Sequence, residues 1–315
     1  MDPLAIVANS LGGLAALYFG ARWLVGAASD VARRLGVSPL LIGLTVVAVG
    51  TSLPELFVGV AASIGGHAGV SLGNVIGANA LNIGLILGVA ALIRPIVVSL
   101  RVLQWDLPVM FAATALLAWF SADGEVTRGE AVILLAAMLA YLGLNIAAGR
   151  RERKASALAG ALEVPHAASL AGDLARGAVG AAALAIGARL LIDGALGLAA
   201  ALGLAEGLVG MTLVAVGTTL PELVTTLVAA ARRQGDLAFG NIVGSNINNA
   251  LTVVGAAAAV APLAAGDVAR APMYALLALT LLAAPVMWRG FVINRWEGGL
   301  LVCGYAAFLW VGLGG

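Results

Sequence analysis

Long apolar segments dominate this chain, and they limit what it can fold into. A helix needs about 20 predominantly apolar residues to cross the hydrocarbon layer of a bilayer, and segments of this kind recur along the whole sequence. Of the 315 residues, 62% are hydrophobic and 10% are charged, whereas roughly a quarter of the residues in an ordinary soluble domain carry charge. The sequence therefore predicts an all-α integral membrane protein.

Ten segments are apolar enough to be transmembrane helices. They cover residues 3–25, 39–65, 69–92, 106–121, 130–148, 172–202, 206–231, 237–264, 271–288 and 297–314. No basic segment or small-residue cleavage pattern marks the start of the chain, so we expect the first segment to be retained as a span. The longest polar interruption separates five spans from five. We expect an N-terminal five-helix repeat over 1–149, a solvated cytoplasmic linker over 150–169 and a C-terminal five-helix repeat over 170–315.

Charge and cysteine content exclude several classes of protein. The net charge of +1 gives no electrostatic reason to expect nucleic acid as a partner. The single Cys303 cannot form an intramolecular disulfide or a multi-cysteine metal site.

Cytoplasmic loops of membrane proteins hold an excess of Lys and Arg. With the N-terminus outside, thirteen Lys and Arg residues fall on the inner side and only Arg128 and Arg270 on the outer side.

This asymmetry predicts that both termini lie outside. We expect the plasma (inner) membrane of a prokaryote as the location. The oligomeric state stays open, and a monomer is compatible with the pattern.

The sequence repeats itself at a shift of 167 residues. Gly43 to Leu56 reads GLTVVAVGTSLPEL and Gly210 to Leu223 reads GMTLVAVGTTLPEL, so that eleven of 14 positions are identical. The same shift pairs GNVIGANALN, which starts at Gly73, with GNIVGSNINN, which starts at Gly240. The repeated motifs cover 43–88 and 210–255. Because each half holds an odd number of spans, the second half must enter the membrane inverted, as in secondary transporters.

Glu55 and Glu222 are acids at matched positions, well inside their predicted spans. An unpaired charge within the bilayer is expensive, and neither segment offers a Lys or Arg at helical spacing. The transported cation is then the expected positive charge. The structural alternative is a pair of protonated acids that hydrogen-bond across helices.

A proline precedes each acid and indicates how the site is made. Pro54 and Pro221 have no N–H to offer the carbonyl four residues earlier, so each predicts a broken helix with the acid at the start of its second half. Thr51, Ser52, Thr218 and Thr219 add hydroxyl oxygens within a turn. Carboxylate, carbonyl, hydroxyl and amide oxygens suit hard cations such as Ca²⁺ and Na⁺, and no His or Cys converges for a softer metal.

The second motif of each half supplies amide oxygens. Asn82 and Asn249 occupy matched positions, and we assign ion contact to them. The other apolar-segment amides include residues that hold helices together by hydrogen bonds. They are Asn74, Asn79, Asn241, Asn246 and Asn248.

These motifs resemble the α-repeats of the sodium/calcium exchangers in the calcium/cation antiporter superfamily. The resemblance covers both halves of the chain and implies a ten-helix fold, four central ion sites and alternating access by sliding of the first and sixth helices, with no cofactor. It further implies residue-by-residue ligand sets. Calcium would be held by Glu55, Glu222 and the carbonyls of Thr51 and Thr218. Sodium would be held by both acids, the carbonyls of Ala48 and Ala215, and the hydroxyls of Thr51, Ser52, Thr218, Thr219 and Ser245.

Two departures from the family pattern bear on function. Asn249 stands where many prokaryotic and potassium-dependent members carry Asp, which leaves two carboxylates in the site and disfavours potassium co-transport. Ala78 stands where the family pattern has Ser, as Ser245 does in the other half, so one inner sodium site lacks a hydroxyl.

Sodium-for-calcium antiport is thus the expected function, and other readings remain as alternatives. A proton/calcium exchanger shares the fold but carries a Glu soon after the Gly-Asn pair, and neither half of this chain has one there. A channel needs a continuous pore, whereas matched broken helices suit alternating access. A purely structural membrane protein would not need the acids. An intramembrane enzyme would need a catalytic spacing such as Ser-Lys or Asp-Asp, and none occurs near the bilayer centre.

Overall fold

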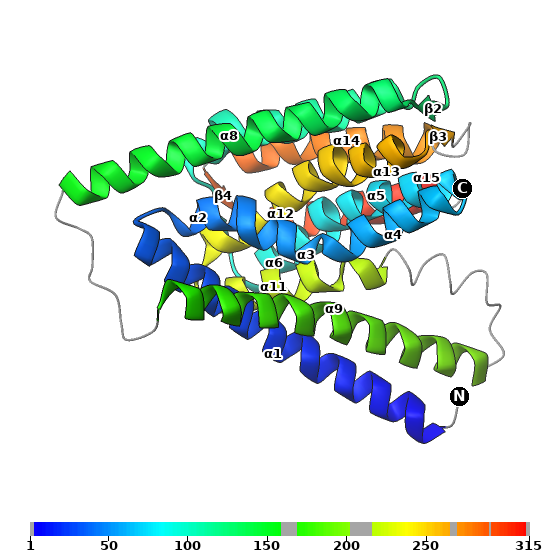
Figure 1. Ribbon diagram of the computed structural model, residues 1–315, viewed down its shortest axis with the longest axis horizontal. Helices are drawn as coiled ribbons and strands as arrows, with labels where there is room; N and C mark the ends of the chain where they lie inside the picture. Colours follow the sequence, from blue (N-terminus) through cyan, green and yellow to red (C-terminus); the bar gives the residue numbers. More distant parts are fainter. Residues whose placement is uncertain (1–2, 159–168, 202–215, 265–269, 290, 313–315) are drawn as a thin grey trace.

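Helices make up nearly all of the computed structural model, which describes residues 3–158, 169–201, 216–264, 270–289 and 291–312 (Figure 1). Four segments labelled η are π-helical, with hydrogen bonds from residue i to i+5. The elements of the first half are α1 (Pro3–Leu35), α2 (Pro39–Ile42), η1 (Gly43–Val47), α3 (Ala48–Thr51), α4 (Leu53–Ile64), α5 (Ala68–Ala80), η2 (Leu81–Ile86), α6 (Leu87–Ile93), β1 (Ile96–Val97), η3 (Val102–Asp106), α7 (Leu107–Phe120), β2 (Glu125–Val126) and α8 (Arg128–Leu158). Those of the second half are α9 (Leu170–Ala201), α11 (Leu220–Ala231), α12 (Gly235–Asn248), η4 (Asn249–Val253), α13 (Val254–Val260), β3 (Leu263–Ala264), α14 (Arg270–Trp288), β4 (Val292–Ile293) and α15 (Arg295–Gly312).

Seven helices in the described part of the chain are long and apolar enough to cross a membrane. They are Leu4–Leu35, Ala68–Ile93, Val102–Phe120, Arg128–Glu152, Leu170–Leu190, Gly235–Val260 and Ala271–Trp288. An eighth span is formed if Pro39–Thr51 and Leu53–Ile64, which meet at an angle of 45°, are counted together. These helices confirm the helical, membrane-spanning character expected from composition.

The internal repeat extends from the sequence to the secondary structure. Both bounds of α4 map onto those of α11 at an offset of 167 residues, and the same holds for α6 and α13. Helix α8 begins with a capping box in which the Thr127 N–H donates to Glu130 Oε2 at 2.8 Å. The residues at the matched positions at the start of α15 form the same bond, in which the Asn294 N–H donates to Glu297 Oε2 at 2.8 Å. Equivalent residues therefore take equivalent local structure in the two halves.

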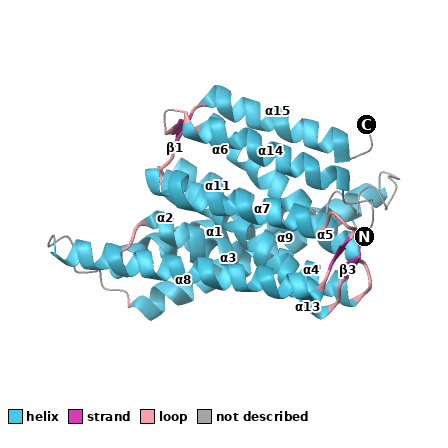
Figure 2. Cartoon of the chain, turned by 90° about the horizontal axis from the view of Figure 1, so that it is seen from above, coloured by secondary structure: helices cyan, strands magenta, loops and turns pink. Residues whose placement is uncertain are grey.

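Two short antiparallel sheets connect the halves. Strand β1 of the first half pairs with β4 of the second, with Ile96 opposite Ile293. Strand β2 pairs with β3, with Val126 opposite Leu263. At the 167-residue offset β1 corresponds to β3 and β2 to β4, so each sheet is the counterpart of the other. They lie at opposite ends of the helix bundle, as Figure 2 shows.

Helices α1 and α9 form an antiparallel pair along one side of the bundle (Figure 1). Their backbones approach closely at glycines: a Cβ added at Gly20 would lie 2.8 Å from the Gly180 carbonyl oxygen, and one added at Gly187 would lie 2.8 Å from the Leu17 nitrogen. Ion pairs join the C-terminal end of α1 to the N-terminal end of α9, linking Arg34 with Asp173 and Arg176 with Asp30. Small residues such as glycine at an interface between membrane helices permit the close approach of the two backbones.

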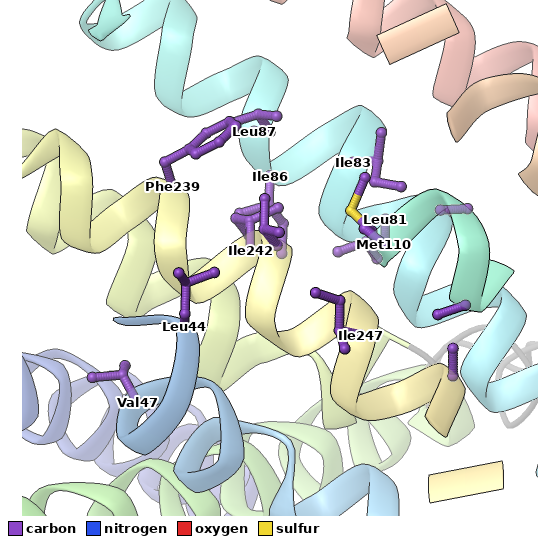
Figure 3. Packing of buried hydrophobic residues seen from close by; sticks show 14 of the residues in the cluster. Leu44, Val47, Leu81, Ile83, Ile86, Leu87, Met110, Phe239, Ile242 and Ile247 are labelled. Carbon is purple, nitrogen blue, oxygen red and sulfur yellow. The ribbon is translucent and has the colours of Figure 1, made fainter. Parts of the chain in front are cut away.

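Helix α12 lies at the centre of the bundle and packs directly on the segment α2–η1–α3. A Cβ added at Gly244 would lie 2.6 Å from the Leu44 carbonyl oxygen, and one at Gly240 would lie 2.7 Å from that of Leu40. The apolar residues that pack around α12 are seen in Figure 3, which labels Leu44, Val47, Leu81, Ile83, Ile86, Leu87, Met110, Phe239, Ile242 and Ile247. The glycines of the second motif thus allow the backbones of α12 and the segment α2–η1–α3 to approach closely.

The structure differs from the sequence prediction at the end of α8. This helix continues to Leu158, past the predicted end of the span at residue 148, so the charged cluster Arg150 to Lys154 is helical. Glu152 is tied to two distant elements, because it accepts from Arg101 Nη1 at 2.7 Å and from the Ser38 N–H at 2.9 Å. Ser38 caps α2, so these bonds fasten the end of α8 to the start of the broken helix.

We predict that Gly244→Ala destabilises the protein by about 1–3 kcal/mol, as expected for overpacking, because the new methyl group meets the Leu44 backbone and Ala48 Cβ. Gly143→Ala is the matched control, since a Cβ there meets nothing within 4 Å and alanine favours the helix. Thermal unfolding of the purified proteins in detergent measures both. Equal melting temperatures for Gly244→Ala and wild type would contradict the packing described.

Candidate ion-binding site

Each of the two matched acids lies just after a break in a helix. Helix α3 ends at Thr51, Ser52 has φ −83° and ψ 8°, and α4 begins at Leu53 with Pro54 in its first turn. Before α11, Thr219 has φ −90° and ψ 0°. Glu55 and Glu222 are in the first turns of α4 and α11. The predicted position of each acid at the start of a second half-helix is confirmed, and the helix dipole favours negative charge there.

Hydroxyl groups from each half of the chain bind the acid of the other half. Thr219 Oγ1 donates to Glu55 Oε1 at 3.2 Å, and Ser52 Oγ donates to Glu222 Oε1 at 2.9 Å. Ser245 Oγ adds a second bond to Glu222 Oε1 at 3.4 Å. Both glutamates have 0% exposure. The two halves therefore build one shared cluster.

A second layer of crossed bonds involves the neighbouring threonines and amides. Thr51 Oγ1 donates to Asn241 Oδ1 at 3.2 Å, and Thr218 Oγ1 donates to Asn74 Oδ1 at 3.1 Å. Asn74 Nδ2 in turn donates to the backbone oxygen of Glu55 at 3.4 Å. Sequence reasoning left the roles of Asn74 and Asn241 open, and the structure shows that they hold the threonines beside the acids. Their matched positions after Gly73 and Gly240 were the available signal.

The two central amides lie in matched π-helical segments. Asn82 belongs to η2 and Asn249 is the first residue of η4. Short π-helical stretches within α-helices are frequent at functional sites. Both residues have 0% exposure, so the sequence-predicted amides are buried in the centre of the bundle.

Four buried oxygens of the acids and central amides have no hydrogen-bond partner in the described part of the chain: Glu55 Oε2, Glu222 Oε2, Asn82 Oδ1 and Asn249 Oδ1. Buried polar groups in proteins nearly always have a partner. Within the described part of the chain, neither Glu55 nor Glu222 forms an ion pair with a basic side chain. These oxygens are the ligand type that hard cations such as Ca²⁺ and Na⁺ take.

Three further ligands predicted from the sequence are Ala48, Ser245 and Ala215. The Ala48 carbonyl oxygen accepts from the Ser52 N–H at 3.1 Å and from Thr51 Oγ1 at 3.3 Å. Ser245 Oγ lies 3.5 Å from Thr51 Oγ1, so the hydroxyls of the two halves meet. Ala215 lies outside the described residues. Within the described ranges, no group of three or more His, Cys, Asp or Glu side chains gathers to hold a metal.

Comparison with known proteins identifies the family. The family described as "Sodium/calcium exchanger protein" matches residues 6–147 and 174–314. The sodium/calcium exchanger MaX1 of Methanosarcina acetivorans is 33% identical over 335 residues, covering 94% of this chain and 95% of MaX1. The putative antiporter CaxA of Alkalimonas amylolytica is 35% identical over 303 residues, covering 94% of this chain and 95% of CaxA.

The fold agrees with these relatives. A solved structure of the sodium-calcium exchanger NCX_Mj, soaked with 2.5 mM Na⁺ and 0.1 mM Ca²⁺, matches with a TM-score of 0.86 and 33% sequence identity, covering 98% of each chain. The motifs from which the resemblance was inferred are those that form the buried cluster. The chain therefore belongs to the sodium/calcium exchanger family of the calcium/cation antiporter superfamily.

Proposed function

We propose that this protein exchanges sodium for calcium across a membrane by alternating access, without potassium. The observation that carries the proposal is the pair of buried acids, Glu55 and Glu222. Each is bound by a hydroxyl of the other half, and each keeps one oxygen without a partner among the described residues. Membership of a cation-antiporter family supports transport, and the proposed exchange involves no cofactor.

The proposed calcium ligands are Glu55, Glu222 and the carbonyls of Thr51 and Thr218. The proposed sodium ligands are both acids, the carbonyls of Ala48 and Ala215, and the hydroxyls of Thr51, Ser52, Thr218, Thr219 and Ser245. Asn82 and Asn249 are proposed as central polar ligands of the shared site, for either ion. Two carboxylates neutralise one Ca²⁺ or two Na⁺. Because the calcium and sodium ligand sets share both acids, the site can hold calcium or sodium but not both at once. A third Na⁺ would leave one positive charge to move with each cycle.

The proposed architecture is ten transmembrane helices arranged as two inverted five-helix repeats. Its support is the 167-residue offset, which relates helix bounds, capping boxes and sheet pairings in the two halves. The antiparallel pair α1 and α9 stands at matched positions, as an inversion requires.

We further propose that both termini lie outside the plasma membrane of a prokaryote. The charged ends of α1 and α9 support this orientation, since Arg33, Arg34 and Arg176 gather at one end of the bundle. The prokaryotic origin of the relatives supports the location.

Coupling to sodium is tested with the purified wild type in proteoliposomes. We expect calcium uptake when the vesicles are loaded with sodium, and no uptake when a proton gradient alone is imposed. Imposed voltage should change the uptake rate if a third Na⁺ is carried. Uptake that follows the proton gradient and ignores sodium would instead identify the proton/calcium exchanger of the same fold.

Glu55→Gln and Glu222→Gln should each reduce calcium uptake to the level of empty liposomes, because the site then carries one carboxylate for a divalent ion. Glutamine keeps the size of the side chain, so each variant should retain the melting temperature of the ion-free wild type. The exposed Glu125→Gln serves as the control and should transport normally. Full exchange by either site variant would refute the assignment.

Ala78→Ser should strengthen sodium binding severalfold. Residue 78 is buried and matches Ser245, whose hydroxyl contacts Glu222, so the new hydroxyl would restore an oxygen beside the acid of the first half. Ser245→Ala removes the matching hydroxyl and should weaken sodium binding, so the two variants should change sodium affinity in opposite directions. Sodium inhibition of calcium binding measures both. Unchanged inhibition in a folded Ala78→Ser protein would remove this position from the sodium site.

A further inference from the structure

Two matched asparagines beside the ion cluster make different contacts. Asn79 Nδ2 donates to the backbone oxygen of Asn246 at 3.2 Å, and Asn79 Oδ1 accepts from Asn249 Nδ2 at 3.1 Å. Its counterpart, Asn246, donates to Ile242 in its own helix at 2.7 Å. The oxygen of the Asn246 side chain and both polar atoms of Asn82 have no hydrogen-bond partner among the described residues. One half therefore reaches across to the central amide of the other, and the reciprocal bond is not formed.

The contact from Asn79 decides which end of the Asn249 amide is free. An asparagine side chain carries an oxygen that accepts and an NH₂ group that donates, and the two ends have nearly the same shape. Asn79 Oδ1 can only accept, so it selects the NH₂ group of Asn249. The Asn249 oxygen is then left buried, with no hydrogen-bond partner in the described part of the chain. A cation binds this oxygen and is repelled by the NH₂ group.

We propose that Asn79 is a positioning residue for ion binding, which holds the carbonyl oxygen of Asn249 toward the cation. The inference rests on the proposed function, because it takes Asn249 as an ion ligand. Asn79 acts through Asn249 and does not itself touch the ion. A ligand held in place before binding loses less conformational freedom when the ion arrives.

The same contact bears on the choice of residue at position 249. A carboxylate there has no N–H and would set an oxygen against Asn79 Oδ1. Asn79 could then donate to it only by turning its own NH₂ group away from the Asn246 backbone. The bonds that Asn79 makes here are therefore suited to asparagine at position 249. The amide of Asn82 has no such hydrogen-bond partner among the described residues.

The test compares calcium binding and exchange by the full-length purified chain. Asn79→Leu keeps much of the volume and removes both polar atoms. It should raise the calcium dissociation constant about tenfold, with a smaller effect on the maximal exchange rate. Asn246→Leu is the matched control, because the hydrogen bond that its side chain makes among the described residues lies within its own helix, and it should stay within about threefold of wild type. If Asn79→Leu does not fold, Asn79→Ala takes its place.

A double mutant separates positioning from a general effect on packing. If Asn79 acts through Asn249, adding Asn79→Leu to Asn249→Ala should cause no further loss of calcium affinity, because the positioned oxygen is already gone. Additive losses, an unchanged affinity in Asn79→Leu, or an equal loss in Asn246→Leu would each overturn the inference. Failure of the proposed function would be seen separately, as wild-type calcium transport that does not depend on sodium.

Discussion

Two carboxylic acids buried in the centre of a membrane helix bundle must have their charge balanced, and the arrangement around them follows from that requirement. Burial of an isolated charge is very costly. The protein supplies Glu55 and Glu222 with neutral donors, the hydroxyls of Thr219 and Ser52, on one oxygen each. Hydroxyls hydrogen-bond a carboxylate without cancelling its charge, and the other oxygens stay open for cations. Under the proposed function, a bound cation supplies the charge that balances the two acids.

The crossed bonds explain why the two halves must be held in close register. Each acid depends on a hydroxyl from the other half, so a small displacement between α4 and α11 would break both bonds. Glycines provide the necessary precision, because Gly240 and Gly244 bring α12 against the backbone of α2–η1–α3. Helices α1 and α9 are joined to each other by glycine contacts and ion pairs. This outer helix pair also packs on the helices of the ion cluster, since α1 contacts α11 and α9 contacts α3.

Sequence predicted the parts of this structure that depend on local chemistry. The prolines before Glu55 and Glu222 indicated both helix breaks, because a residue without an N–H cannot complete the preceding turn. The paired strands and the exchange of hydroxyls between halves depend on which faces meet, and a repeat in the sequence does not specify that. The sequence did not predict the extension of α8, because the partners of Glu152, Arg101 and Ser38, are distant in sequence. The π-helical segments at Asn82 and Asn249 had no recognised sequence signal.

The most direct test of the account is the location of a bound divalent ion. Crystals of the protein soaked in strontium, an anomalous scatterer that substitutes for calcium, would place the ion independently of any transport assay. We predict one anomalous peak between the side chains of Glu55 and Glu222, within ligand distance of both, which disappears when the soak contains excess sodium. A peak at another place in the molecule, or one at this place that persists in excess sodium, would contradict the shared ion site.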